Sequence, residues 1–594
     1  MENQMQNIKV IRAGSFAERA GACYVRIRAM AVKHHITLDR EFDEHDTPEA
    51  MYLVALDGVL PVATCRLFPI GETAMTAGRI VVLPEYRHRG LGSRMVQEAE
   101  RWAVELGYHK VVLESRVNKQ AFYEKLGYAA VPGPVIHGDT FDCVRMEKVL
   151  KSEKREKRKM NELWEKVYKA YTFSFPLMIM DATVRVSTNT VEPGGLGKAP
   201  ANRWMHAQEL ATASFRQVVT PNVDTIYSQI FIDLSKDALV LYKPAVSRYV
   251  MFQVMDAWSD TVAVLGTGGD TDDERTYLLT GPHFCGEVPA GMTQVKIPTS
   301  TAWLLGRVIC FGPDDMGNIY KIQKEMDVKP LAVWKSGGEL PKGRYDPDNE
   351  GIPIRMVFSM GPAEYFSRAN RLMIDNPPYA EDAPILKEIA QIGVGPGLTF
   401  DPGILGKDAA DHWKHMAGGL AQELVAKNAG FLVKNRSFRF FGAPISRFGT
   451  EYEYRCLTAI GGFGANPVDV AVYMRSGADD TGAVLNGRNK YVMHFEAGEM
   501  PPVKEKGFWS VTAYGEDDFL IENPIDRYAV SDRTSYEKNE DGSVDIYIQK
   551  DEPKGHKANW LPVSGDGFHL FLRVYRPEDS VLDGRWAAPS IKIK

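Results

Sequence analysis

The sequence has little cysteine and no long apolar run, and each shortage excludes a class of protein. Only 6 of its 594 residues are cysteine, and none forms a C-x-x-C pair. This argues against a disulfide framework or a cysteine-rich zinc site and favours a reducing, cytoplasmic location. No stretch approaches the roughly 18 consecutive apolar residues that span a bilayer. The first residues also lack the apolar core of a signal peptide. We therefore expect no contact with a membrane.

A strong excess of one charge is also missing. The formal net charge is −6, with 44% hydrophobic and 25% charged residues, which is typical of a globular protein without a nucleic-acid partner. The H-E-x-x-H and G-x-S-x-G motifs are absent. His412 and His415 share one face of a predicted helix, but no third ligand is indicated, so we predict no metal site. The length predicts two or three domains.

A polar, mostly basic segment divides the chain. Residues 151–160, KSEKREKRKM, cannot pack into a core, and an amphipathic helix pattern follows them. A basic segment can mark contact with a membrane or a nucleic acid, but the glutamates in this one favour a solvated linker. We predict one domain over residues 1–150 and further domains after residue 160.

Strand and helix patterns alternate in residues 1–150, which predicts an α/β or α+β sheet domain. An apolar strand over residues 79–83 runs into R-H-R-G-L-G and then into a helix over residues 93–106. Glycines at such a turn let backbone N–H groups approach a ligand, and the helix N-terminus favours an anion such as phosphate. The turn is neither a Walker loop nor a full dinucleotide fingerprint. By itself, it is equally compatible with a tight connection that carries surface arginines.

A second motif, NKQAFYEKLGY, follows the next predicted strand and favours the interpretation of the turn as a ligand site. Arg87, Gly90 and Gly92, followed by Asn118, Ala121, Phe122 and Tyr123, closely resemble the two signatures of the GCN5-related N-acetyltransferase (GNAT) family. The gap between the alanine and the Phe-Tyr pair is two residues shorter than in many members. The resemblance covers roughly residues 5–150.

The resemblance implies an acetyl-coenzyme A site and a proton donor. Tyr123 would protonate the departing thiolate, with a core tyrosine that packs a helix on the sheet as the alternative. Glu114 is the candidate base on the fifth strand. Glu44 and His45, in the acidic loop 40–46, are weaker candidates, and that loop would suit a cationic amine. The residues implied in cofactor binding are Ile80, Val81, Val82, Leu83, Arg87, His88, Arg89, Gly90, Leu91, Gly92, Ser93 and Asn118.

Short alternating strands separated by turn signals dominate the rest of the chain. They predict two mainly antiparallel β-sandwich or jelly-roll-like lobes, over residues 161–330 and 441–594, joined by a helical section over residues 331–440. The region also resembles two paired domains of unknown function, numbered 1254 and 1214, which imply no chemistry. Polar and aromatic residues at strand ends suggest a pocket in the first lobe; turn capping and a buried ion pair are the alternative. The pocket candidates are Asn222, Asp224, Tyr227, Asp256 and Arg307.

These patterns together predict an acetyl-coenzyme A-dependent N-acyltransferase that acts on a small-molecule amine and is fused to a β-rich module. Two alternatives remain open. In one, the large module is the main enzyme, hydrolysing or isomerising a small polar metabolite. In the other it is a ligand-binding module, and in both the first domain is accessory.

Overall fold

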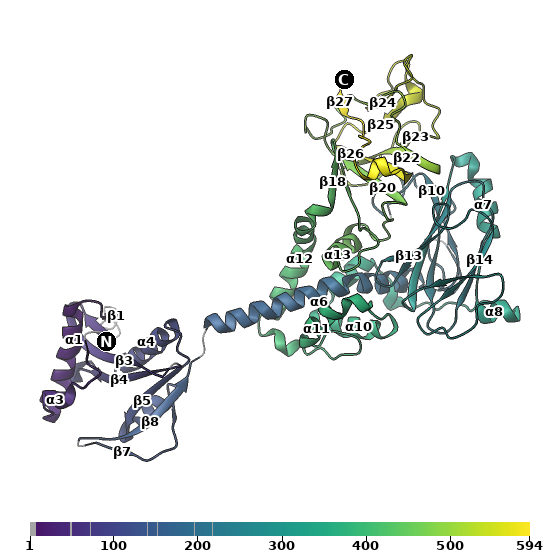
Figure 1. Cartoon of the computed structure of the whole chain (residues 1–594). Coiled ribbons are helices and arrows are strands. Elements are labelled where there is room, and N and C mark those ends of the chain that lie inside the picture. The colour runs from purple at the N-terminus through teal and green to yellow at the C-terminus, as the bar shows by residue number, and fades with distance from the viewer. Residues whose placement is uncertain are drawn as a thin grey trace. The chain divides into compact units, whose positions relative to one another are not determined.

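The computed structural model describes residues 8–47, 50–71, 73–138, 140–150, 153–194, 197–216 and 218–594. The chain forms two compact units, Met1–Glu162 and Leu163–Lys594 (Figure 1). Helix α6 (Glu153–Ser187) begins inside the charged segment that we predicted to be a linker. Lysine, arginine and glutamate are strong helix formers, which explains why this charged segment is helical. Residues 151 and 152 lie outside the described residues.

The first unit is built on one sheet with helices around it, so the predicted α/β class is confirmed. Neighbouring strands are antiparallel except for β4 and β5, and the short strand β7 (Ile136–His137) pairs with β8. The sheet order is β1 (Ile8–Arg12), β2 (Met51–Asp57), β3 (Leu60–Ile70), β4 (Ala74–Val82), β5 (Lys110–Arg116), β8 (Asp142–Val149) and β6 (Ala129–Ala130). The helices are α1 (Phe16–Arg26), a π-helical turn (Ile27–Ala31), α2 (Val32–His34), α3 (Leu38–Glu41), α4 (Leu91–Glu105) and α5 (Gln120–Glu124).

Helix α4 packs on this sheet through the apolar face that its sequence predicts. Met95, Val96, Ala99 and Ala103 are buried in the core of the first unit. Leu106, which we placed on the same face, is 47% exposed because the helix has already ended at Glu105.

Strands β4 and β5 pair only at their beginnings. Their parallel register covers Ala74–Thr76 against Lys110–Val112, whereas β4 continues to Val82 and β5 to Arg116. The register between β3 and β4 also shifts where Arg79 takes a positive φ of 48°. An extra residue of this kind bends a strand. The far ends of β4 and β5 therefore diverge, and a wedge opens between them.

The first lobe of the second unit is a sandwich of two mainly antiparallel sheets, with β14 and β15 as its parallel pair. Its core lies between the sheets and includes Ile226, Leu241 and Leu304. One sheet has the order β13 (Thr261–Gly266), β12 (Val250–Asp256), β16 (Thr301–Ile309), β10 (Thr225–Asp233) and β9 (Met205–His206). The other has the order β15 (Thr293–Lys296), β14 (Arg275–Thr280), β11 (Leu239–Lys243) and β17 (Asp327–Pro330).

The second lobe is another such sandwich, with β24 and β25 as its parallel pair. The predicted alternation is confirmed, because Phe568, Leu570, Leu572 and Val574 all lie in its core. One sheet has the order β18 (Leu432–Asn435), β19 (Phe438–Phe441), β20 (Ala471–Ser476), β26 (Phe568–Pro577), β22 (Val503–Gly515) and β23 (Ala529–Ser531). The other has the order β25 (Trp560–Pro562), β24 (Val544–Gln549), β21 (Tyr491–Phe495) and β27 (Ile591–Ile593).

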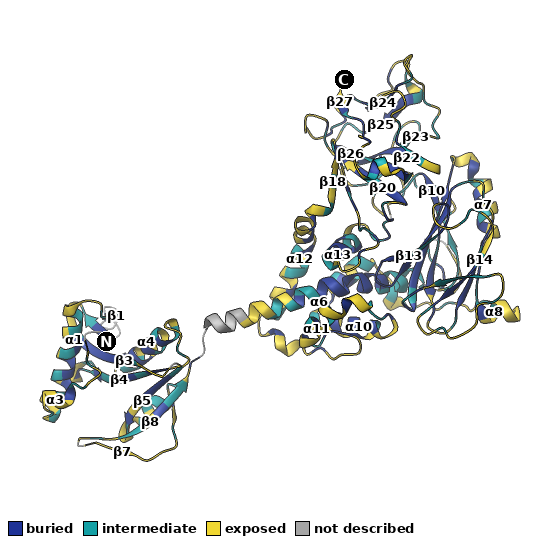
Figure 2. Ribbon diagram, viewed as in Figure 1, coloured by how far each residue is buried: buried dark blue, intermediate teal, exposed yellow. Residues whose placement is uncertain are grey.

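Helices form a third core in the second unit. Helix α6 becomes buried toward its C-terminal end (Figure 2) and packs against helices that come later in the chain. None of the described helices is long and apolar enough to cross a membrane. The helices that follow α6 are α7 (Met316–Glu325), α8 (Leu331–Ser336), α9 (Pro353–Ser359), α10 (Pro362–Asp375), α11 (Ala383–Ile389), α12 (Ala409–Lys427), α13 (Tyr452–Gly461) and α14 (Asp579–Leu582).

Candidate functional sites

The glycine turn of the first unit places unpaired backbone donors at the start of α4. Gly90 has a φ of 79° and caps the helix without a side-chain hydrogen bond, and His88 also has a positive φ of 61°. The first N–H groups of a helix lack intrahelical acceptors and carry positive potential. Arg87 Nε donates to Val82 O at 2.9 Å, and Arg89 is exposed. The turn can therefore hold a phosphate through its backbone.

The other predicted cofactor residues surround this turn. Ile80 and Val82 are half-buried, whereas Val81 and Leu83 are buried against the sheet. At the start of α4, Leu91 is buried and Ser93 is half-buried, and Asn118 is exposed in the turn before α5. Beyond Thr76 no described strand pairs with β4 on its β5 side, so backbone groups there can meet an extended ligand.

The two sequence motifs of the first unit meet in space. A Cβ at Gly92 would lie 3.5 Å from Phe122 Cζ, so α5 packs within van der Waals distance of the start of α4. The neighbouring Tyr123 is half-buried, and its ring centroid lies 4.9 Å from that of Phe122. Burial, with a smaller contribution from Cys65, raises the pKa of Tyr123, so its hydroxyl keeps its proton at neutral pH.

Glu114 is exposed on β5, directly opposite Arg145 of β8. It shares a face of the strand with Arg116, two residues further on. Burial and then the charge of Glu114 raise the pKa of Cys143. The cationic neighbours place Glu114 in an electropositive part of the sheet.

The acidic loop 40–46 is mostly neutralised by arginines. Arg26 Nε lies 2.9 Å from Glu41 Oε1, and Arg26 Nη1 lies 2.6 Å from Asp46 Oδ1. Arg66 holds Asp43 through two hydrogen bonds, of 2.5 and 2.9 Å. Burial opposes ionisation of Asp46, but hydrogen bonds, first from Arg26, outweigh burial and hold its pKa well below the usual range.

This pairing changes the interpretation of the loop as a site for a cationic amine. Of its two candidate bases, Glu44 has a side chain 83% exposed, and His45 stacks on Phe68 with ring centroids 3.9 Å apart. The negative charges that suggested a cationic partner are largely used to hold the loop in place. Spacing along the sequence could not show this, because Arg26 and Arg66 lie on other elements.

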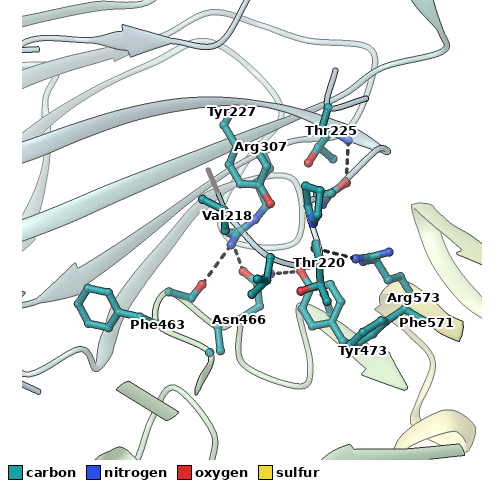
Figure 3. A pocket seen from close by; sticks show the side chains of 18 of the residues that line it. Val218, Thr220, Thr225, Tyr227, Arg307, Phe463, Asn466, Tyr473, Phe571 and Arg573 are labelled. Atoms are coloured by element: carbon teal, nitrogen blue, oxygen red, sulfur yellow. Dashed lines mark hydrogen bonds between the residues drawn. The ribbon is translucent and has the colours of Figure 1, made fainter. Parts of the chain in front are cut away.

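The second unit contains a cavity of about 1930 Å³ between its two sandwiches. Strands β10 and β16 of the first lobe and β20 and β26 of the second contribute to its wall. The opposite faces of these strands form the cores of the two sandwiches. The cavity therefore lies between the outer faces of the two sandwiches. Residues from both lobes surround it in Figure 3.

The structure brings three of the five predicted pocket residues to this cavity: Asn222, Tyr227 and Arg307. Asp224 and Asp256 do not line it. Asp224 pairs with Arg533. Asp256 Oδ1 accepts hydrogen bonds from backbone N–H groups of its own turn, at 2.9 and 3.1 Å. For these two aspartates the structure agrees with the alternative of an ion pair and turn capping.

The polar residues of the cavity wall that sequence reasoning missed include Asn466, Tyr473 and Arg573. Arg573 stands between Leu572 and Val574, so strand alternation placed it on the outer face of the second sandwich. That pattern is typical of a solvent-facing residue. Only the packing of the two lobes against each other makes this face internal.

Comparison with known families agrees with this division of the chain. The model described as "Acetyltransferase (GNAT) family" matches residues 21–128. Models described as "Protein of unknown function", DUF1254 and DUF1214, match residues 201–330 and 470–579.

Individual relatives match each unit separately. An uncharacterized acetyltransferase of Streptococcus pyogenes serotype M1 is 30% identical over 115 residues, which are 19% of this chain and 80% of the relative. A Bacillus subtilis protein named as an acetyltransferase is 38% identical over 90 residues, 15% of this chain and 60% of its own. A crystal structure from Vibrio parahaemolyticus covers 72% of this chain and 99% of its own, with a TM-score of 0.55. At 23% identity it shows a shared fold alone. The chain thus belongs to the GNAT acetyltransferase family through its first unit and to the DUF1254 and DUF1214 families through its second.

Proposed function

We propose that the first unit transfers an acetyl group from acetyl-coenzyme A to an amine nitrogen of a small molecule. The observation that carries the proposal is the uncapped start of α4 at Gly90, next to the wedge between β4 and β5. Such a helix start suits the pyrophosphate of coenzyme A, and the wedge suits its extended arm. The six cysteines are free thiols, which fits a reducing cytoplasm.

When bound, acetyl-coenzyme A supplies the acetyl group as a reactive thioester. The amides of residues 89–93 would hold the pyrophosphate, with charge-assisted contacts from the Arg87 and Arg89 side chains. The free edge of β4 over residues 80–83 would pair with the extended arm. Tyr123 would donate the proton of its hydroxyl to the leaving thiolate, and its raised pKa keeps that proton in place at neutral pH until then. Glu114 remains the candidate that accepts a proton from the amine.

Isothermal titration of acetyl-coenzyme A into the full-length chain tests this proposal. We expect micromolar binding, and we expect Gly90→Val to abolish it, because a β-branched side chain disfavours the positive φ and would project beside the turn. Gly107→Val is the matched control. Gly107, at the other end of α4, has a φ of 90° and, like Gly90, no atom within 4 Å of the position that a Cβ would take. Absence of binding, or an equal loss in both variants, would contradict the proposal.

The cavity of the second unit favours one of the two alternatives for that unit. Neither Asp224 nor Asp256 lines it, because Asp224 pairs with Arg533 and Asp256 caps its own turn, so the two carboxylates of the predicted pocket are not available to a ligand there. A partly open cavity of about 1930 Å³ instead supports a ligand-binding module.

A further inference from the structure

Two buried arginines line the large cavity without a carboxylate partner. Arg307 comes from β16 of the first lobe and Arg573 from β26 of the second, and each is 3% exposed. Neither forms an ion pair with any carboxylate in the described part of the chain. A buried charge is costly unless a counter-charge accompanies it.

Arg307 is held by neutral acceptors. Its Nη1 donates to Gln253 Oε1 at 2.9 Å and to Asn466 Oδ1 at 2.8 Å, and its Nη2 donates to Gly464 O at 3.1 Å. Its Nε is buried and has no partner among the described residues. Asn466 in turn donates to the Tyr473 hydroxyl at 2.7 Å, as the dashed lines in Figure 3 show.

Arg573 is held in the same way. Its Nη1 donates to Thr512 Oγ1 at 2.9 Å, and its Nη2 donates to the Tyr514 hydroxyl at 2.6 Å and to Thr220 O at 3.3 Å. Asp224 lies close enough to act on it electrostatically but forms its ion pair with Arg533 and accepts a hydrogen bond from Ser510 at 2.6 Å. The positive charge of Arg573 is therefore without a contacting anion.

The rest of the wall contains three more arginines, two of which have partners. Arg439 of β19 stands directly opposite Arg475 of β20. Arg475 pairs with Asp518 and Arg216 pairs with Asp517, and both aspartates lie outside the wall. The described wall thus contains five arginines, and Glu209 is its only acidic residue. An anion in the cavity would compensate the buried charges of Arg307 and Arg573.

Apolar side chains line other parts of the same space. The cavity exceeds the roughly 300–1,000 Å³ of a typical small-molecule site, so it can hold a long ligand. The apolar part of the wall includes Trp303, Leu305, Leu432, Phe441, Ile460 and Phe463.

From this geometry we infer that the second unit binds an amphipathic organic anion, with its carboxylate or phosphate head on Arg307 and Arg573 and its apolar body along the cavity wall. Guanidinium groups match both head groups through paired hydrogen bonds. The proposal concerns the second unit alone and does not depend on acetyl transfer by the first.

Titration of decanoate, decyl phosphate and decanol into the full-length chain tests this inference. We expect at least one of the two anions to bind at least about ten-fold tighter than the alcohol, because only the anions can pair with the guanidiniums. Whichever of decanoate and decyl phosphate binds identifies the head group as carboxylate or phosphate. Equal affinity for decanol and the anions, or no binding of any of the three, would overturn the inference.

Substitution of each arginine locates the binding. Arg307→Gln and Arg573→Gln remove the charge but keep amide donors for the neighbouring acceptors, and each should weaken anion binding at least about ten-fold. Arg447→Gln is the matched control, since Arg447 is 50% exposed, pairs with Asp469 and does not line the cavity. Equal affinity in all four proteins would overturn the assignment.

Two further measurements keep the test decisive. If an arginine variant does not fold, the wild-type melting temperature should still rise more with the anion than with decanol at equal concentration; no difference would overturn the inference. Gly90→Val, in the first unit, should leave anion binding unchanged. Failure of acetyl-coenzyme A binding and failure of anion binding are thus separate results.

Discussion

Arg26 Nη1 lies 2.6 Å from Asp46 Oδ1 in the first unit, and the same guanidinium contacts Glu41 through its Nε at 2.9 Å. The arginine side chain is fully buried, and Asp46 also lies 2.7 Å from Arg66 Nη1. These contacts join α1 to the loop after α3 and to β3. They determine the path of the loop that follows α3.

Arg26→Met should destabilise the first unit by about 3–5 kcal/mol, because it removes the nearest cation of the buried Glu41 and one of the two arginines that contact Asp46. Urea-dependent hydrogen exchange of the α1 amides measures this. Arg101→Met is the control: its side chain is 66% exposed and pairs with Glu98 at the surface, so we expect a change below about 0.5 kcal/mol. A similar small change for both variants would show that the buried contacts are not stabilising.

Tyr123→Phe should lower kcat for acetyl transfer by about 10²–10⁴-fold and leave the affinity for acetyl-coenzyme A unchanged, because it removes only the proton donor. The rate of thiol release, with the best amine from a screen, gives the first quantity and calorimetry the second. Tyr24→Phe, at an exposed position of α1, should change neither. Unchanged kcat in Tyr123→Phe would assign that tyrosine to the core.

His206 should make the second unit less stable in mild acid. Burial lowers its pKa to about 4, against about 6.5 in an unfolded chain. Between these values the unfolded chain binds a proton that the folded one does not. The stability that the neutral His206 contributes is therefore fully present above pH 6.5 and is lost as the pH falls toward 4. His206→Gln should reduce the loss by roughly 1–3 kcal/mol, measured by urea unfolding at pH 7 and pH 4.5. The exposed His283→Gln should reproduce the wild-type dependence.

Asp224→Asn should destabilise the second unit by about 1.5–3 kcal/mol, because it removes a buried charge-assisted contact, while Arg533 keeps Asp532 at 2.8 Å. Binding of the anionic probe to the folded variant should persist, since Asp224 does not line the cavity. Urea unfolding and calorimetry measure the two effects. Asp469→Asn, which breaks an exposed pair with Arg447, should change neither by more than about 0.5 kcal/mol. Lost binding at unchanged stability would instead indicate that Asp224 is part of the binding site.

The sequence by itself determined the features that depend on local spacing. The turn at Gly90 and Gly92 was recognisable because a tight strand–helix connection needs glycine at defined positions. The core side of β26 was recognisable because alternate side chains of a strand share a face, which placed Leu570 and Leu572 together. The division into a first α/β unit and later β-rich lobes followed from the same periodicities.

Only the tertiary structure decided which residues the outward-facing side chains of each strand contact. Arg307 and Arg573 occupy outward positions on strands of two different sandwiches, and the docking of the lobes makes both of them line one cavity. The same docking pairs Asp224 with Arg533 of the other lobe. Strand alternation states which way a side chain points, but the partner it finds depends on elements distant in the chain. For that reason the charge of this cavity could not be read from the sequence.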